Sequence, residues 1–347
     1  MSEKTENVNI REIARQAGVS VASVSRALQD SPSKKISAEL RTKILQICDE
    51  QQYYPNMHTV RMLKNRSNTI ALLAPPECIH VESEYDYIDY NLAGVIGGVE
   101  KFLSGHSMYV TIASMTENFI ANKEYLKFSR GKMVDGFIAW GLTSRDEFIY
   151  ELIAEGAPLV AVQGGFGKIT GSQVNAQDYE GMGRIVEYVV SQGHRRIAYI
   201  PALETSFSGV ERNRGFADAM SQAGLAPFMV TEETGFNPDV GYAAATRIFR
   251  EKLKPTCIVA ANDYVALGVI KAAGEFHLRI PEDISLTGAD GLMLPAQFQL
   301  TTYLSPSFQL GVAGAEMLCR IIDNPAMPPE NTRLPVRFVP GMTVARI

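Results

Sequence analysis

The chain has 347 residues, of which 46% are hydrophobic and 20% charged, a composition typical of a globular protein with a large buried core. No apolar run approaches the ~18 residues of a membrane span, and the polar start MSEKTENVNI lacks the apolar core of a signal peptide, so we expect a cytoplasmic protein with no membrane partner. The net charge of −5 is uneven, because residues 1–70 hold 11 Lys and Arg against 7 Asp and Glu, whereas residues 71–347 hold 22 against 31. A basic segment on an acidic chain indicates that only the N-terminal part meets a polyanion.

The sequence offers no pattern for catalysis or metal binding. The four cysteines form no C-x-x-C pair, and the five histidines are isolated from one another. Neither a G-x-S-x-G, a phosphate-binding G-x-x-x-x-G-K-[ST] nor an H-E-x-x-H motif occurs. We therefore expect a protein that is not an enzyme and has no metal site and no cofactor.

The first 30 residues predict two short helices joined by a tight turn. Asn9 and Glu12 have the spacing of a capping box, so a first helix is expected over 10–17. Gly18 follows at the position where a left-handed helix end favours glycine, and Ser20 can cap the next helix. A third helix is expected after Ser37, with the basic residues Arg41 and Lys43 on its outside.

The second helix has one face suited to the DNA major groove. Arg26 can donate two hydrogen bonds to guanine, while Val21 and Ala22 can contact thymine methyl groups. Ser20 and Ser25 are short donors suited to nearby phosphates. The alternative is an ordinary three-helix core with a solvated basic face.

From Thr69 onward, short apolar runs alternate with stretches of helical periodicity, which predicts α/β units with parallel sheets. The expected strands are TIALLA, MYVTIA, GFIAW, PLVAV, RIAYI, TCIVAA and ISLTG, and the expected helices are 92–104, 180–192, 211–223, 240–252, 263–276 and 307–323. A segment of this length is too long for one small sheet, so we expect two lobes.

Ligands of such folds bind at the carboxyl ends of the strands. Those ends carry Trp140, Gln163, Asn262 and Asp290, and an arginine follows the run RIAYI. An indole, two amides, a guanidinium and a carboxylate suit a neutral polyhydroxylated ligand. Trp140 could instead be a core residue, and Asn262 and Asp290 could be helix caps.

The segment IREIARQAGVSVASVSRAL resembles the helix-turn-helix of the lactose-repressor/galactose-repressor family of bacterial transcription regulators. The resemblance implies that Val21, Ala22 and Arg26 read bases. Tyr53 and Pro55 match the tyrosine and proline that precede the family's hinge helix. The resemblance also implies that either Met62 or Leu63 wedges into the minor groove, although the match departs from the family pattern here and leaves that choice open. A flexible linker is the alternative for this stretch.

The rest of the chain is similar to the family's sensor, which resembles periplasmic binding proteins. The segment VERNRGF points to Arg212, and not Arg214, as the arginine that grips the effector. By the same resemblance, the effector-binding residues are Trp140, Gln163, Arg212, Phe236, Asn262 and Asp290. Gln163 stands where many members have aspartate, and Ser305 where glutamine is common. One of Tyr85, Tyr87 and Tyr90 is expected to join the site.

The sequence thus predicts a DNA-binding head at 1–55 and a hinge at 56–69. An effector-binding and dimerisation body follows at 70–347. Its first lobe is expected at about 70–176 and 305–330, and its second at about 177–304 and 331–347.

The predicted function is a sequence-specific transcriptional regulator, and by preference a repressor, of carbohydrate-utilisation genes. We expect a homodimer that binds a pseudo-palindromic operator in double-stranded DNA and is controlled by a sugar-like effector between the lobes. The alternatives are a regulator that responds to a purine or nucleoside, and a stand-alone sugar-binding protein.

Overall fold

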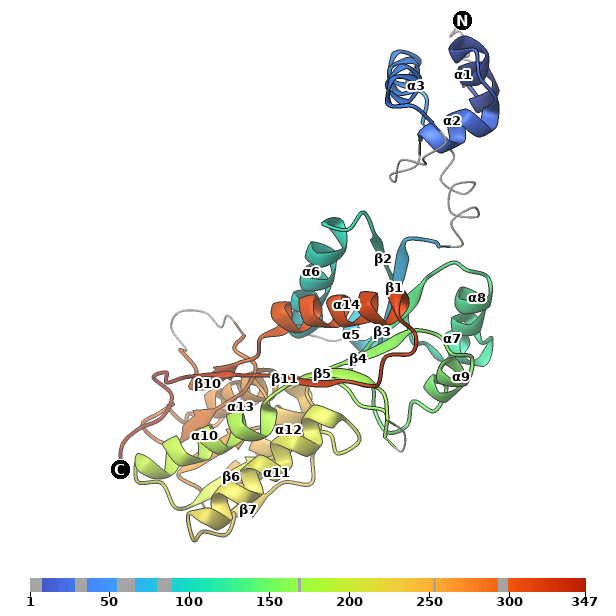
Figure 1. Ribbon diagram of the computed structural model, residues 1–347. Coiled ribbons are helices and arrows are strands. Elements are labelled where there is room, and N and C mark those ends of the chain that lie inside the picture. The colour runs from blue at the N-terminus through green and yellow to red at the C-terminus, as the bar shows by residue number, and fades with distance from the viewer. Residues whose placement is uncertain are drawn as a thin grey trace, which may run out of the picture. The chain divides into compact units, whose positions relative to one another are not determined.

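The computed structural model describes residues 8–28, 36–54, 66–79, 89–167, 170–251, 254–292 and 299–347. The chain divides into two compact units, Met1–Ser67 and Asn68–Ile347, which we call the head and the body (Figure 1). No helix among the described residues is both long and apolar enough to cross a membrane.

The head is the predicted three-helix unit. Its helices are α1 (Ile10–Ala17), α2 (Val21–Ala27) and α3 (Ala38–Glu50). Their predicted ends are confirmed: the side chains of Asn9, Ser20 and Ser37 accept backbone hydrogen bonds at the three N-termini, and Gly18 has a φ of 71° after α1. The small core consists of the buried residues Ile13, Ala14, Ala17, Val24, Ala27, Ile44 and Cys48.

The capping box at α1 is only half formed. The Asn9 side chain accepts hydrogen bonds from the backbone of Arg11 and Glu12. The Glu12 carboxylate binds Arg15 and Gln16 one turn along the helix, and no bond to the Asn9 backbone is formed. A nearby guanidinium therefore competes successfully with the cap for this carboxylate.

The body contains two parallel sheets, as predicted (Figure 1). In the first sheet the strand order is β11-β5-β4-β3-β1-β2, and in the second it is β7-β6-β8-β9. The strands of the first sheet are β1 (Thr69–Ala74), β2 (Tyr109–Ser114), β3 (Gly136–Trp140), β4 (Leu159–Val162), β5 (Ser172–Ala176) and β11 (Asn331–Leu334). The strands of the second are β6 (Ile197–Ile200), β7 (Met229–Val230), β8 (Cys257–Ala260) and β9 (Ser285–Thr287), and a separate antiparallel pair is formed by β10 (Thr302–Leu304) and β12 (Arg337–Val339).

Helices cover both faces of each sheet. Helices α6 and α14 pack on one face of the first sheet, and α8 and α9 pack on the other (Figure 1). Successive residues of β1 point to opposite faces, so this strand contributes apolar side chains to both layers. Helices α12 and α13 cover one face of the second sheet, and α10 and α11 the other. The helices of the body are α5 (Pro76–Ile79), α6 (Tyr90–Ser104), α7 (Glu117–Ala121), α8 (Glu124–Arg130), α9 (Ile149–Ala154), α10 (Asp178–Ser191), α11 (Phe207–Gln222), α12 (Pro238–Arg250), α13 (Asp263–Glu275) and α14 (Ser307–Asp323).

Two predictions about the body need correction. Helix α11 begins at Phe207 and not at 211, because the Ser206 side chain caps it by accepting from the Gly209 backbone. The range 331–347 was assigned to the second lobe, but β11 pairs in parallel with β5 of the first sheet. The chain returns toward the second lobe only after Leu334, so the last crossing occurs later than the sequence suggested.

The packing of α12 on α13 yields a prediction about stability. Gly241 and Gly268 let the two helix backbones touch, and a Cβ at Gly241 would collide with the carbonyl of Val265. We expect Gly241→Ala to lower the free energy of unfolding by ~1–3 kcal/mol in chemical denaturation, because the helices must move apart.

Gly183→Ala is the matched control. A Cβ at Gly183, within α10, meets no atom within 4 Å. Alanine should therefore raise stability by ~0.5–1 kcal/mol through helix propensity alone. Equal effects of the two substitutions would show that close helix contact is not what requires Gly241.

Candidate functional site

Helix α2 presents the face that the sequence predicted for DNA. Val21 and Ala22 are exposed, while Val24 and Ala27 on the opposite side are fully buried. The half-buried Arg26 guanidinium makes no hydrogen bond to another described residue. The helix thus offers two apolar side chains and one guanidinium on one surface.

Other predicted head residues have local structural roles. Ser20 caps α2 by accepting from the Ser23 backbone, and Tyr53 packs, half-buried, against the core of the head. Burial raises the pKa of Tyr53. Met62 and Leu63 lie outside the described residues, as does the hinge segment around them.

The sequence predicted that Arg41 and Lys43 of α3 lie on the outside of the helix. In the structure both side chains also contact the other two helices of the head. Arg41 donates to the carbonyl of Ala27 and Lys43 to that of Ala17, at 3.1 and 3.2 Å. Each thus binds the C-terminal end of one of the preceding helices, where the helix dipole favours positive charge. The spacing within α3 alone does not reveal these contacts, because they depend on how the three helices pack.

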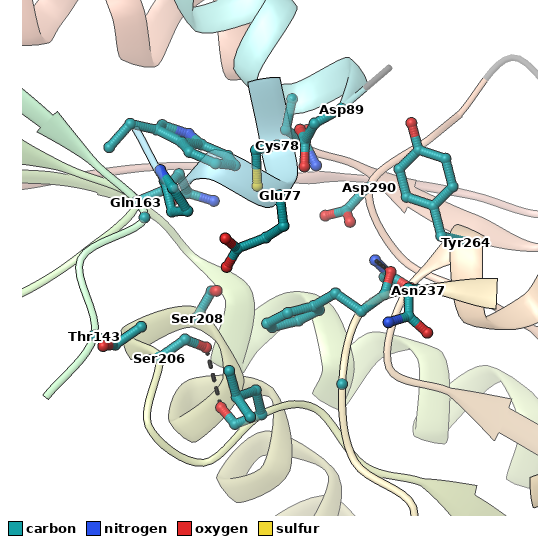
Figure 2. Close-up of a pocket in the computed structure, with 18 of the residues that line it drawn as sticks. Glu77, Cys78, Asp89, Thr143, Gln163, Ser206, Ser208, Asn237, Tyr264 and Asp290 are labelled. Carbon is teal, nitrogen blue, oxygen red and sulfur yellow. Dashed lines mark hydrogen bonds between the residues drawn. The ribbon is translucent and has the colours of Figure 1, made fainter. Parts of the chain in front are cut away.

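The body contains a cavity of about 360 Å³ at the carboxyl ends of strands from both sheets (Figure 2). This is the size expected of a small-molecule site. All six side chains predicted for the effector line it, namely Trp140, Gln163, Arg212, Phe236, Asn262 and Asp290. Ser305 and Tyr90 are absent from the lining, and Tyr85 and Tyr87 lie outside the described residues.

A buried ion-pair network lies against this cavity. Arg212 of α11 bridges Asp178, the first residue of α10, and Asp290, in the loop after β9. Its Nε donates to Asp178 at 2.9 Å, its Nη1 and Nη2 donate to Asp290, and its Nη1 also donates to the carbonyl of Ala261 at 3.0 Å. Nη2 also lies 2.8 Å from the Asp178 carboxylate in an ion pair. The guanidinium therefore forms four hydrogen bonds to protein oxygens, out of the five that its N–H groups can donate.

The protonation states in this network reflect burial. Asp178 is fully buried, which raises its pKa even though Arg212 opposes the change. Tyr303 donates its hydroxyl to the same Asp178 oxygen at 2.6 Å, and burial raises the pKa of Tyr303 further above its ordinary value. The network ties α10, α11 and β10 to the loop that carries Asp290, which has a strained φ of 100°.

The two amides of the predicted set are partly used by the protein. Asn262 caps α13 by accepting from the Val265 backbone at 2.8 Å, and it donates to the carbonyl of Phe236 at 3.1 Å. Gln163 accepts from the backbone of Ala176 at 2.8 Å. Both side chains therefore shape the cavity as well as line it.

The two aromatic side chains among the six predicted effector-binding residues lie on opposite lobes. Trp140 ends β3 and is only 8% exposed, and its indole N–H has no hydrogen-bond partner among the described residues. Phe236 precedes α12, with its ring 5.8 Å from the Arg212 guanidinium carbon. Flat faces and polar groups therefore meet in one cavity.

The structure adds acidic and polar lining residues that the sequence analysis did not select. Glu77 and Cys78 belong to α5, and Asp89 caps α6 by accepting from the Leu92 backbone at 2.8 Å. Burial and the neighbouring Asp290 carboxylate raise the pKa of Asp89 to about 6, and burial raises that of the Cys78 thiol. The position of Glu77 and Cys78 just after β1, at a strand end, is the signal that could have found those two residues.

His194 has a structural role in the second lobe. One ring nitrogen of His194 lies 2.9 Å from the Thr256 hydroxyl and the other 2.9 Å from the carbonyl of Ala345. The described residues contain no group of three or more side chains placed to hold a metal ion.

Comparison with known proteins places both units. Residues 9–56 match the family of bacterial regulatory proteins called the lacI family, and residues 186–344 match the periplasmic binding protein-like domain. The chain is 29% identical to the HTH-type transcriptional repressor PurR of Edwardsiella ictaluri over 89% of each chain. Among solved structures, the lac repressor dimer bound to operator and the anti-inducer ONPF superimposes with a TM-score of 0.82 over 98% of this chain and 100% of the other, at 22% identity. The transcriptional regulator CelR in complex with cellobiose gives 0.72 over 97% and 99%, at 23% identity.

The ion-pair network predicts unequal roles for two neighbouring arginines. Arg212→Ala leaves Asp178 and Asp290 buried without their shared cation, which should lower the free energy of unfolding by ~3–5 kcal/mol. Arg214 is 54% exposed, and its buried partner Glu211 also pairs with Arg333 at 2.6 Å, so Arg214→Ala should cost no more than ~1 kcal/mol. Denaturant unfolding of the two variants measures both values, and similar midpoints would contradict a central structural role for Arg212.

Proposed function

This chain belongs to the lacI family of bacterial regulatory proteins and is a DNA-binding transcriptional regulator, and we propose that a sugar-like molecule in the cavity of its body controls it. The observation that carries this proposal is the meeting of all six predicted effector side chains in one cavity. We assign residues 1–55 to the DNA-binding head, 56–69 to the hinge and 70–347 to the effector-binding body. Since the target is DNA, we place its action in the cytoplasm.

The head supplies the sequence-reading surface. Arg26 lies on the same helix as the exposed Val21 and Ala22, and a guanidinium beside apolar side chains is the pattern that recognises guanine and thymine edges in the major groove. Ser20 and Ser25 are assigned to neighbouring phosphates, and Tyr53 supports the helices. We propose that two copies of the chain bind the two halves of a pseudo-palindromic operator, with Met62 or Leu63 inserted at its centre.

The body supplies the sensor. Its cavity lies at the strand ends of two lobes, so a bound ligand contacts both and favours one lobe arrangement over another. Side chains that hydrogen-bond hydroxyl groups, together with Trp140 as a flat apolar face, suit a sugar. The sugar is bound as an inducer if it favours the DNA-free state and as a corepressor if it favours the DNA-bound state.

A purine or nucleoside is the second candidate. Trp140 and Phe236 both line the cavity and could stack on a planar base. The amide of Gln163 could then recognise the base edge, as an amide pairs with adenine in other contexts.

A thermal-shift screen of the full chain against sugars, sugar acids, sugar phosphates, purines and nucleosides tests the sensor. A compound at about 100 times its dissociation constant should stabilise the folded body by ~2.7 kcal/mol, which is a measurable rise in melting temperature. Repeating the screen with operator DNA gives the sign of control. If no compound shifts the transition, the body does not act as a small-molecule sensor of these classes.

The DNA-reading role of Arg26 is tested by binding titrations on an operator selected from random duplexes. Arg26→Ala should reduce the preference for operator over scrambled DNA by ~1–3 kcal/mol, because a bidentate contact to guanine is lost. Arg26→Lys is the matched control, since it keeps the charge but not the planar fork. It should retain non-specific affinity while losing the same preference, and an unchanged preference in both variants would remove Arg26 from base reading.

A further inference from the structure

The cavity proposed as the effector site carries unbalanced negative charge. Glu77, Asp89 and Asp290 are among the described residues that line it, and Arg212 is the only basic side chain among them. Figure 2 shows the three carboxyl groups arranged around the same space. They come from α5, from the N-cap of α6 and from the loop after β9, so three separate parts of the body supply them.

Arg212 does not balance this charge. It is already shared between Asp290 and the fully buried Asp178, and it donates four hydrogen bonds to protein oxygens. Glu77 forms no ion pair with another described residue. The interaction between Asp89 and Asp290 is itself repulsive, and it contributes, after burial, to the raised pKa of Asp89.

Ligand binding raises the free-energy cost of holding these negative charges close together. A bound molecule displaces water from the carboxylates, and their mutual repulsion then acts in a medium of lower dielectric constant. The hydroxyl groups of a neutral ligand can donate to the carboxylates and replace lost water, but they leave the repulsion between the charges, whereas an anionic ligand such as a sugar acid or sugar phosphate increases that repulsion. A ligand with a positive charge offsets it.

We propose that the effector of this chain carries a protonated amine on a polyhydroxylated ring, as an amino sugar does, and that Glu77, Asp89 and Asp290 surround the amine. The inference rests on the proposed sensor function and narrows its ligand class. The hydroxyl groups of such a ligand face the amide and aromatic side chains on the other walls of the cavity.

Calorimetric titration of the full chain with matched sugars tests the charge directly. The probes are glucosamine, galactosamine and mannosamine at pH 7, each with its neutral parent sugar and its uronic acid. The best amino sugar should bind about tenfold or more tightly than its parent, and the uronates should not bind measurably. A parent sugar or a uronate that binds as well as the amino sugar overturns the inference and leaves the sensor function standing.

Two charge-removing variants identify the groups responsible. Asp89→Asn keeps a side-chain oxygen that can cap α6, and Glu77→Gln changes an exposed residue, so both should fold. Each should reduce the preference for the amino sugar by about two- to fivefold. Glu100→Gln, an exposed position on α6 outside the cavity lining, removes the same charge and should leave the preference unchanged.

A second measurement does not require the ligand to be known. Cys78 lines the cavity, so its thiol can report the local potential through its rate of reaction with methanethiosulfonate reagents. The trimethylammonium reagent should modify Cys78 about tenfold faster than the sulfonate reagent, and the ratio should fall in Asp89→Asn. Mass spectrometry of the Cys78 peptide separates this reaction from that of the half-buried Cys319.

The two measurements separate the possible failures. If no sugar in the panel binds, the sensor function is in doubt and the labelling ratio decides the charge of the cavity. Equal rates for the two reagents would show that the cavity is not negatively charged, which overturns the inference whatever the panel shows.

Discussion

The bond between Arg212 and its two carboxylates is the interaction on which the body most depends. A guanidinium that is 2% exposed is stable only if its charge is matched and its donors find partners, and here Asp178, Asp290 and the carbonyl of Ala261 accept four hydrogen bonds from it. Asp178 is the first residue of α10, and Asp290 lies in the loop after β9. The two ion pairs therefore hold both segments in place against α11. The carboxylate of Asp290 is held at the cavity wall as a consequence.

This arrangement changes what Arg212 can do for a ligand. The sequence suggested an arginine that grips the effector, and an arginine with free donors would do so. With four hydrogen bonds to protein oxygens, Arg212 also acts through Asp290, whose position it fixes. A ligand that competes for Asp290 also changes how Arg212 is shared with Asp178 at the start of α10, which gives the cavity a physical connection to the segment joining the lobes.

The sequence predicted most of the features that depend on local rules. Cap residues such as Asn9, Ser20 and Ser37 and the glycine after α1 follow from short-range spacing, and all seven apolar runs became strands. The rule that ligands bind at strand ends selected side chains that do share one cavity. Strand β5 was missed because SQVNA is polar, and its buried Asn175 is tolerated because it exchanges two hydrogen bonds with the backbone of Gly164.

What could not be predicted depends on contacts between distant segments. The crossing of β11 into the first sheet, the binding of helix ends by Arg41 and Lys43, and the occupied donors of Arg212 are all of this kind.

The negative charge of the cavity also depends on contacts between distant segments, and it bears directly on the choice of ligand. Glu77 and Asp89 are ordinary acidic residues in sequence, and neither is unusual until Asp290 arrives from more than 200 positions along the chain. The two-lobed fold explains why a cavity lies at the strand ends of both sheets, but not why this one gathers three carboxylates against a single arginine that already pairs with Asp178 and Asp290. An excess of carboxylates in a cavity is tolerated if water screens their repulsion, or if another group offsets the repulsion when water is displaced. Since a closed site excludes water, the offset comes from a proton on Asp89, whose pKa is raised to about 6, or from the ligand, and the electrostatics of the cavity therefore favour a positively charged molecule.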